Sequence, residues 1–549
     1  MGLADDLRSI RCGDVDDADA TRDAVQYDAS IFAARPEVVV APTSSDEIGA
    51  LVRYAAAHSG VSIVARGAGT DMSGGAIGES VILDMTRHLN RLLDVNRDEA
   101  VRGQQGSATV QPGMYYRDFE RATLARGLQY PVYPASRDLC TVGGMVANNS
   151  AGERSLRYGQ AVDWVRSCRA ILADGNEYLF EPLDFGGVQL KMSRIGFEGD
   201  LYRALWKLVT EQREFLERYQ PKVSKNASGY NLWRVWDGTT FDLTKLMVGS
   251  QGTLGVVTRV TLGLIRPPLH RRMVVVFLRD LPYVASVVDD LLQFQPESLE
   301  SFDDKTLSFT VRFLPDFVRL MGASNIIALG LQFLPEAWMT VTGGLPKLVL
   351  MAEFSGDDEQ EVTKRAEAAL GALKRRHLKA RLTEGPEESH KYWTIRRQSF
   401  NVLRHHTTGK RTVPFIDDII VPVERMSEFL PKLYTLLEPY RLTLTVAGHA
   451  GNGNFHIIPL MDLADPNTKK TIVELSEKVY DLVLDHGGSI TAEHNDGLIR
   501  GPWVRKQFGP KMYDLFRQVK QLFDPKGIFN PGKKIDVDRE WALAHIRTN

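Results

Sequence analysis

The stretch V-S-I-V-A-R-G-A-G-T-D-M-S-G-G occupies residues 61–75 and decides the fold of this chain. It begins with a short apolar run, Val61–Ala65, which predicts a buried strand. Four glycines follow within residues 67–75, and glycines at this density let successive backbone N–H groups point into one anion-binding concavity. Thr70 and Ser73 add hydroxyl donors and Arg66 adds positive charge. The stretch predicts a phosphate cradle; a plain surface turn is the alternative.

Two common phosphate-binding motifs are excluded by what surrounds this loop. It is not a P-loop, because no Gly-Lys-Ser/Thr follows it. It is not the dinucleotide fingerprint of a Rossmann unit, because a second strand, Ser80–Met85, follows instead of a helix. Before it, Val38–Val40 predicts a strand, and the capping residues Thr43–Glu47 start an amphipathic helix. This βαβ unit delivers a pyrophosphate cradle of another kind.

Length and composition bound the remaining possibilities. A chain of 549 residues is too long for one core, so we expect two or three domains. The 67 Lys+Arg against 69 Asp+Glu give no argument for nucleic acid. Cys12, Cys140 and Cys168 form neither a disulfide framework nor an iron–sulfur motif, which favours a reducing, cytoplasmic location. The acidic N-terminus predicts no signal peptide, and no apolar run reaches the ~18 residues of a membrane span.

A second glycine-rich stretch, Tyr133–Gly159, consists mostly of small residues. A flat aromatic ligand needs such a wall, since bulky side chains would fill the slot; an ordinary small-residue loop is the alternative. A hairpin is predicted over Asp163–Leu179, around Asp174-Gly175. Leu246–Leu264 places further glycines directly before an alternating strand, and Arg266-Pro267-Pro268 marks a domain boundary.

The sharpest chemical signal is V-A-G-H-A-G-N-G-N-F-H at residues 446–456, followed by T-A-E-H at 491–494. Two strands flank a glycine turn, so His449 and His456 are expected at adjacent positions across a hairpin. Glu493 can add an oxygen ligand. Two imidazoles and one carboxylate leave open coordination positions, as a catalytic metal site requires. The alternative is two packed core histidines with a solvated Glu-His pair.

R-G-A-G-T-x-x-S-G-G after a βαβ unit resembles the pyrophosphate loop of the flavin-binding domain shared by vanillyl-alcohol oxidase and p-cresol methylhydroxylase (the PCMH type). Within that superfamily the chain resembles FAD-dependent D-2-hydroxyacid dehydrogenases, the D-lactate, glycolate and D-2-hydroxyglutarate enzymes, from about Glu37 to Ile535. The resemblance implies an α+β fold. A lead-in (1–36), polar and expected to be loose, precedes a two-part PCMH-type FAD-binding domain (37–268). An α+β substrate (cap) domain with an antiparallel sheet (269–460) and a helical C-terminal segment packing on the FAD domain and returning to the flavin (461–549) follow.

The resemblance also implies the site residues. His449, His456 and Glu493 would hold a divalent metal, zinc or manganese, and His494 would be the base. Arg396, in W-x-x-R, would bind the substrate carboxylate, with Arg397 as a shift by one and Lys410 and Arg411 as candidates for a second acid group; without the resemblance, solvated arginines on a helix are as good a reading. The residues implied to bind FAD are Arg66, Gly67, Ala68, Gly69, Thr70, Ser73, Gly74, Pro134, Ser136, Thr141, Gly143, Gly144, Asn148, Ala151, Gly152, Val257 and Asn530.

Three departures from the family pattern bear on these expectations. Asp71-Met72 replaces Gly-Leu, so Asp71 must point away from a pyrophosphate or pair with a cation. Ile458 stands where dicarboxylate-using relatives often have a polar residue, which weakens a hydroxyglutarate assignment. Asn495–Leu498 resembles the segment of long enzymes in which an iron–sulfur domain follows. Because the three cysteines of this chain form no iron–sulfur motif, we expect any iron–sulfur cluster to sit on a separate partner, or the electrons to go to another acceptor.

The predicted function is FAD- and metal-dependent oxidation of a small D-2-hydroxy acid to a 2-oxo acid, with hydride transfer to flavin N5. The electrons would pass to a quinone, an electron-transfer protein or a separate iron–sulfur protein. The alternatives are a non-redox enzyme resembling alkylglycerone-phosphate synthase and a flavin-holding subunit of a larger complex. A homodimer is left open. The aromatic-rich segment Phe309–Leu348 is expected to be mostly ordinary core or a packed loop, with a surface for a partner or a membrane face as the alternative.

Overall fold

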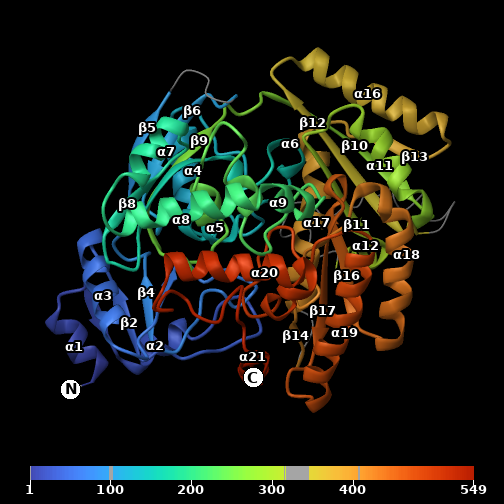
Figure 1. Cartoon of the computed structure of the whole chain (residues 1–549). Coiled ribbons are helices and arrows are strands. Elements are labelled where there is room, and N and C mark those ends of the chain that lie inside the picture. Colours follow the sequence, from blue (N-terminus) through green and yellow to red (C-terminus); the bar gives the residue numbers. More distant parts are fainter. Residues whose placement is uncertain (1, 98–102, 314–315, 317–344, 406–408, 549) are drawn as a thin grey trace.

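The computed structural model describes residues 2–97, 103–313, 316, 345–405 and 409–548. These residues form a four-stranded, a five-stranded and an eight-stranded sheet. The two smaller sheets and their helices make up one half of the molecule and the eight-stranded sheet the other (Figure 1). Most of the Phe309–Leu348 segment lies outside the described residues, so both alternatives stated for it stay predictions.

The four-stranded sheet contains the predicted βαβ unit. Strands β2, β4 and β3 pair in parallel, and Ser44 caps α3 by accepting a hydrogen bond from the Glu47 N–H. The expectation of a loose lead-in was wrong, because β1 pairs antiparallel with β2 and Leu7 and Cys12 are buried. The bounds are α1 (Leu3–Ser9), β1 (Asp14–Asp16), α2 (Asp19–Val25), β2 (Val38–Ala41), α3 (Ser45–Ala57), β3 (Ile63–Arg66) and β4 (Val81–Asp84).

The five-stranded sheet is antiparallel, in the order β5-β6-β9-β7-β8, and confirms the hairpin predicted around Asp174-Gly175. A large apolar cluster joins this sheet to its helices. The bounds are β5 (Leu92–Asn96), β6 (Gly106–Val110), α4 (Tyr116–Leu124), α5 (Val142–Asn148), α6 (Ser155–Tyr158), β7 (Val165–Ile171), β8 (Glu177–Phe180), α7 (Phe185–Met192), α8 (Phe197–Glu211), α9 (Arg213–Tyr219), α10 (Thr244–Met247) and β9 (Val256–Leu264).

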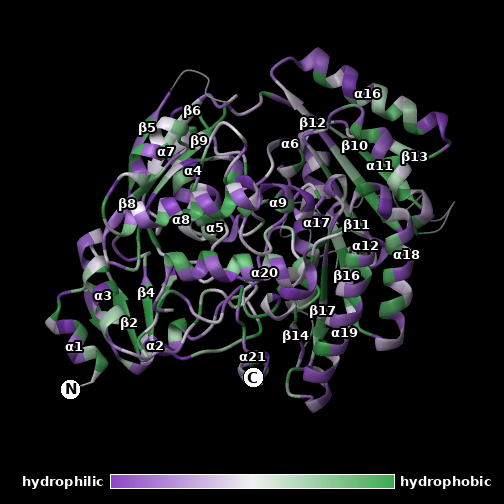
Figure 2. Ribbon diagram, viewed as in Figure 1, coloured by the Kyte–Doolittle hydropathy of each residue, from purple (hydrophilic) through white to green (hydrophobic). Residues whose placement is uncertain are grey.

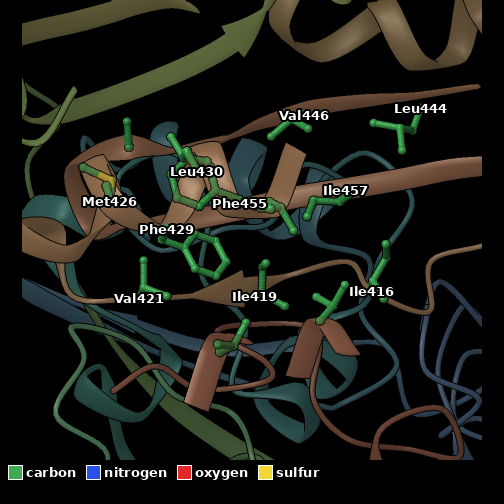
Figure 3. Packing of buried hydrophobic residues seen from close by; sticks show 14 of the residues in the cluster. Ile416, Ile419, Val421, Met426, Phe429, Leu430, Leu444, Val446, Phe455 and Ile457 are labelled. Carbon is green, nitrogen blue, oxygen red and sulfur yellow. The ribbon is translucent and has the colours of Figure 1, made fainter. Parts of the chain in front are cut away.

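The eight-stranded sheet confirms the predicted antiparallel cap domain. Helices α11, α16, α18 and α19 bury one face of it, and Figure 3 shows the packing of Phe429 and Leu430 of α18 there. Helices α12 and α17 lie on the other face. The bounds are β10 (His270–Leu278), α11 (Val284–Leu292), β11 (Ser298–Asp303), α12 (Asp304–Arg312), β12 (Leu348–Gly356), α16 (Glu359–Arg375), β13 (Lys379–Leu382), α17 (Pro386–His405), β14 (Arg411–Thr412), β15 (Ile419–Ile420), α18 (Met426–Leu437), β16 (Thr443–His449), β17 (Asn454–Met461) and α19 (Pro466–Asp485).

The C-terminal segment joins both halves. Helix α19 packs in the core of the eight-stranded sheet, whereas α20 (Val504–Phe523) packs against α8 and α9. Helices α16 and α20 carry both hydrophilic and hydrophobic residues (Figure 2), as helices with one buried face do. The chain then returns to the first sheet, where Phe529 pairs in parallel with Ile63, and ends with α21 (Arg539–Ala544). None of the described helices combines the length and apolar character needed to cross a bilayer.

Candidate active site

A cavity of about 570 Å³ lies where the two halves meet, lined by the glycine loop, the small-residue stretch and the cap sheet. Sixteen sequence-predicted site residues line it: Gly67, Ala68, Gly69, Thr70, Pro134, Ser136, Thr141, Gly144, Asn148, Ala151, Gly152, Arg396, His449, His456, Glu493 and His494. Segments more than 400 residues apart thus meet around one hollow, as the sequence predicted.

The cavity wall on the flavin-domain side is built of close backbone contacts. A Cβ on Gly152 would lie 2.1 Å from the carbonyl oxygen of Tyr133, and one on Gly67 would lie 2.2 Å from the Thr141 hydroxyl oxygen. Gly69 adopts the left-handed backbone region, with φ of +69°, which glycine enters without strain. These positions have no room for a side chain, so the slot between the walls stays open.

Six residues predicted to bind FAD are not among those lining this cavity: Arg66, Ser73, Gly74, Gly143, Val257 and Asn530. Arg66 is buried and donates instead to the carbonyls of Val25, Tyr27 and Ala76. The Asn530 amide donates 2.8 Å hydrogen bonds to the carbonyls of Gly75 and Gln251. Both residues stabilise the backbone in and around the glycine loop through these hydrogen bonds. Direct contact with a flavin stays a prediction for these six residues, as it does for those that line the cavity.

Asp71 has hydrogen-bond partners that the sequence did not indicate. It lines the cavity, but its carboxylate accepts hydrogen bonds from the N–H groups of Ser73 (3.0 Å) and Gly75 (2.7 Å) and from the Asn148 amide (2.9 Å). Gln251, which sequence analysis missed, also donates to Asp71 and to Ser73. Asp71 therefore organises the glycine loop by accepting its donors.

The β16–β17 hairpin places the two predicted histidine ligands on one face of the cap sheet. His449 pairs with Asn454 and His456 with Ala447, so the histidines are diagonal neighbours rather than a directly opposed pair. Their ring centroids lie 5.2 Å apart. Side chains alternate between the faces of a strand, which puts both histidines on the cavity side and Val446 in the core.

Three imidazoles converge on one oxygen of Glu493. Its Oε1 lies 3.2 Å from His449 Nε2, 3.3 Å from His456 Nε2 and 3.9 Å from His494 Nε2. The structure thus brings together all four residues that the sequence selected. Because His494 faces the same point as the two histidine ligands, its geometry suits a fourth ligand as well as a base.

Each of these imidazoles has a buried carboxylate at its other nitrogen. Nδ1 of His449 lies 2.7 Å from Glu300 Oε1, that of His456 lies 3.1 Å from Asp417 Oδ1, and that of His494 lies 2.8 Å from Asp417 Oδ2. Such carboxylate–imidazole pairs orient metal-binding histidines and fix their tautomer. Sequence analysis missed Glu300 and Asp417; the one available signal was the Asp417–Asp418 doublet within the otherwise apolar run 413–421.

The charges of this cluster favour a cation. Burial alone would lower the pKa of His456, but the Asp417 and Glu493 carboxylates outweigh it and raise that pKa to about 10. Burial opposes ionisation of Glu493, yet Lys225 and His449 hold its pKa well below the usual value. Lys225 Nζ lies 3.1 Å from Glu493 Oε2. The carboxylates thus stay ionised, and a divalent cation would replace the proton that they retain on His456.

Donor atoms of Asp418, His456, Glu493 and His494 all lie within 4.8 Å of one another, a spacing that fits one metal ion. Oδ2 of Asp418 is already occupied, however, because it accepts the N–H groups of Glu493 (2.8 Å) and His494 (2.7 Å). Imidazole and carboxylate donors match zinc and manganese. The cluster therefore fits a divalent ion, with Asp418 shaping the loop that carries two of its members.

Of the two arginines in the W-x-x-R segment, Arg396 is the one available to a ligand. Arg397 donates hydrogen bonds to the Glu153 carboxylate from both its Nε (3.0 Å) and its Nη2 (2.6 Å). Both arginines line the cavity. Nη2 of Arg396 lies 3.3 Å from Glu300 Oε2, and its buried Nε has no hydrogen-bond partner in the described part of the chain. Lys410 and Arg411 are exposed and are not among the lining residues.

Two family models match the chain. Residues 36–178 match an FAD-binding domain, and residues 267–534 match the C-terminal domain of FAD-linked oxidases. The chain thus combines an FAD-binding domain with a region similar to the C-terminal domain of FAD-linked oxidases. Most of the residues that line the cavity lie within these two matched regions.

Individual relatives narrow the comparison. The chain is 28% identical over 536 residues to the D-2-hydroxyglutarate dehydrogenase of Escherichia coli (strain K12), covering 95% of this chain and 50% of that one. It is 26% identical over 530 residues to the glycolate oxidase subunit GlcD of Bacillus subtilis (strain 168), covering 95% and 94%. The chain thus spans about half the length of the D-2-hydroxyglutarate dehydrogenases of Escherichia coli, Pseudomonas putida and Pantoea ananatis.

Among solved structures, p-cresol methylhydroxylase superposes with a TM-score of 0.65 at 14% identity, covering 96% of each chain. At this identity the likeness concerns the fold alone. It confirms the predicted PCMH-type α+β architecture.

Proposed function

We propose that this chain catalyses the FAD- and divalent-metal-dependent oxidation of a D-2-hydroxy acid to a 2-oxo acid. The observation that carries the proposal is the convergence of His449, His456, Glu493 and His494 on one point of a cavity whose other wall is the glycine loop. The names of the relatives support a 2-hydroxy acid as the substrate class.

The cofactors would divide the chemistry between them: a bound flavin supplies a hydride acceptor, and a bound divalent ion supplies a Lewis acid that lowers the pKa of the substrate hydroxyl. In the proposal His449, His456 and Glu493 hold the metal ion. Arg396 binds the substrate carboxylate with its guanidinium fork, which leaves the C2 carbon directed at the flavin side of the cavity.

His494 takes the hydroxyl proton at Nε2. Its Nδ1 lies 2.8 Å from Asp417, and an ionised carboxylate can only accept, so in the neutral imidazole the Nδ1 carries the proton and the Nε2 the lone pair. The Asp417 carboxylate also stabilises the imidazolium that forms. Glu153 keeps Arg397 occupied, and we therefore assign the substrate carboxylate to Arg396.

The electrons would leave the reduced flavin for a separate carrier, a quinone, an electron-transfer protein or an iron–sulfur protein. We place the reaction in a reducing compartment, in keeping with the free, buried state of Cys12, Cys140 and Cys168.

Anaerobic flavin reduction tests the proposal. Purified flavoprotein loaded with zinc or manganese is mixed with D-lactate, glycolate or D-2-hydroxyglutarate, and the flavin absorbance is followed. At least one acid should bleach the flavin, with the L-enantiomers of the chiral acids as controls, and His494→Gln should slow bleaching by about 10²–10⁴-fold. Absence of bleaching by every acid in metal-loaded enzyme would count against the proposal. A flavin-holding subunit would instead bind flavin without bound metal.

A further inference from the structure

We propose that Asp417 is a shared positioning residue, whose single carboxylate fixes the tautomer of both His456 and His494. One buried side chain would thereby couple the metal-holding imidazole to the base. The inference rests on the proposed function for the roles of the two histidines, and on the geometry around Asp417 for the sharing itself.

The two oxygens of Asp417 are divided between the two rings. Oδ1 lies 3.1 Å from His456 Nδ1 and Oδ2 lies 2.8 Å from His494 Nδ1. The rings are stacked, with centroids 5.0 Å apart and planes 21° apart. Asp417 is fully buried. In the described chain neither its Oδ2 nor His494 Nδ1 makes a hydrogen bond of good geometry, and the 2.8 Å approach between them is a charge contact. Each of these two atoms therefore has only the other to satisfy it.

The chemistry of the carboxylate then determines both tautomers. An ionised carboxylate accepts and never donates, so both Nδ1 atoms must carry a proton. Once a divalent ion has replaced the second proton of His456, the unprotonated nitrogen of each neutral ring is Nε2, which lies 3.3 Å (His456) or 3.9 Å (His494) from Glu493 Oε1. An amide in place of the carboxylate offers one acceptor and one donor, so it cannot orient both rings in this way.

The carboxylate is held rigidly enough to perform this role. The Asp417 carbonyl accepts a 2.7 Å hydrogen bond from the buried Arg500 guanidinium. The next residue, Asp418, has φ of +66° and binds the backbone N–H of His494 at 2.7 Å. The 417–418 turn and the loop that carries His494 are therefore tied together on both sides of the shared contact.

His449 supplies an internal control because it has a carboxylate of its own, Glu300, at 2.7 Å from its Nδ1. Glu300→Gln should disturb the metal site through His449 alone. Asp417→Asn should disturb the metal site through His456 and, in addition, the tautomer of His494.

The test uses full-length, zinc-loaded protein labelled with ¹⁵N-histidine. Long-range ¹H–¹⁵N correlation spectra report which ring nitrogen is protonated, and His456→Gln and His494→Gln assign the signals. Wild-type His494 should carry its proton on Nδ1. A proton on Nε2 would overturn the inference, and this readout holds even if Asp417→Asn and Glu300→Gln do not fold.

Zinc titrations against a competing chelator complete the test. Zinc affinity should fall about 10–100-fold in both Asp417→Asn and Glu300→Gln, whereas only Asp417→Asn should change the His494 signal. An unchanged His494 signal in Asp417→Asn, or an equal change in both variants, would overturn the sharing. A wild-type protein that binds no zinc or manganese would contradict the proposed function instead, while the His494 tautomer would still decide the inference.

Discussion

The substitution Asp418→Asn tests how the loop carrying Glu493 and His494 is held. Oδ2 of Asp418 accepts hydrogen bonds from the Thr491 hydroxyl (2.5 Å) and from the N–H groups of Ala492 (2.9 Å), Glu493 (2.8 Å) and His494 (2.7 Å). A hydrogen bond to a charged group contributes about 1 kcal/mol more than a neutral one. Loss of the charge across four donors should therefore lower the free energy of opening this loop by about 3–4 kcal/mol.

The amide also removes an acceptor. Asn454 now donates to Asp418 Oδ1 at 3.1 Å, and an asparagine that keeps its oxygen toward the loop would turn its NH₂ toward that donor. Since about 1.4 kcal/mol corresponds to a factor of ten, amide hydrogen exchange in residues 489–496 should accelerate about 10²–10³-fold. Hydrogen–deuterium exchange with mass spectrometry measures this directly. Asp465→Asn, at an exposed helix cap, is the control; unchanged protection in Asp418→Asn would refute the reasoning.

Three further substitutions or conditions test other parts of the site. Gly152→Ala should abolish FAD retention, because its Cβ would lie 2.1 Å from a backbone carbonyl oxygen across the wall, whereas Gly385→Ala, with nothing within 4 Å, should retain FAD on gel filtration. Arg396→Lys should raise the KM for the hydroxy acid about 10–100-fold through loss of the bidentate contact, and the exposed Arg411→Lys should leave it unchanged. In metal-free protein the pKa of His456 is raised from 6.5 to about 10. The contribution of the charged His456 to folding stability is therefore complete below about pH 6.5 and is lost as the pH rises toward 10. The melting temperature should fall over that interval, and fall less in His456→Gln.

Local patterns were sufficient to predict much of the architecture. The Val61–Gly75 stretch predicted a strand and a cradle, and the cap at Ser44 predicted the helix before it. Alternation and a glycine turn predicted the hairpin with His449 and His456. These features depend on near neighbours in the chain, so periodicity and turn residues encode them.

The charged residues that contact the predicted metal ligands were not predictable, because the fold brings them there from distant parts of the chain. Glu300 lies 149 residues before His449 along the chain, and Lys225 lies 268 residues before Glu493. No spacing or motif links such pairs in one sequence. The role of Arg66 was likewise hidden, since its partners include carbonyls of an N-terminal segment that composition alone described as loose.

The central claim is that His449, His456 and Glu493 hold one divalent ion beside a flavin, with His494 next to it as the base. Elemental analysis of the purified protein, divided by its flavin content, measures this most directly. The account predicts one zinc or manganese per flavin in the wild-type protein and loss of the metal with retention of the flavin in His456→Gln. A wild-type protein with full flavin and no metal, or a His456→Gln variant that keeps its metal, would contradict it.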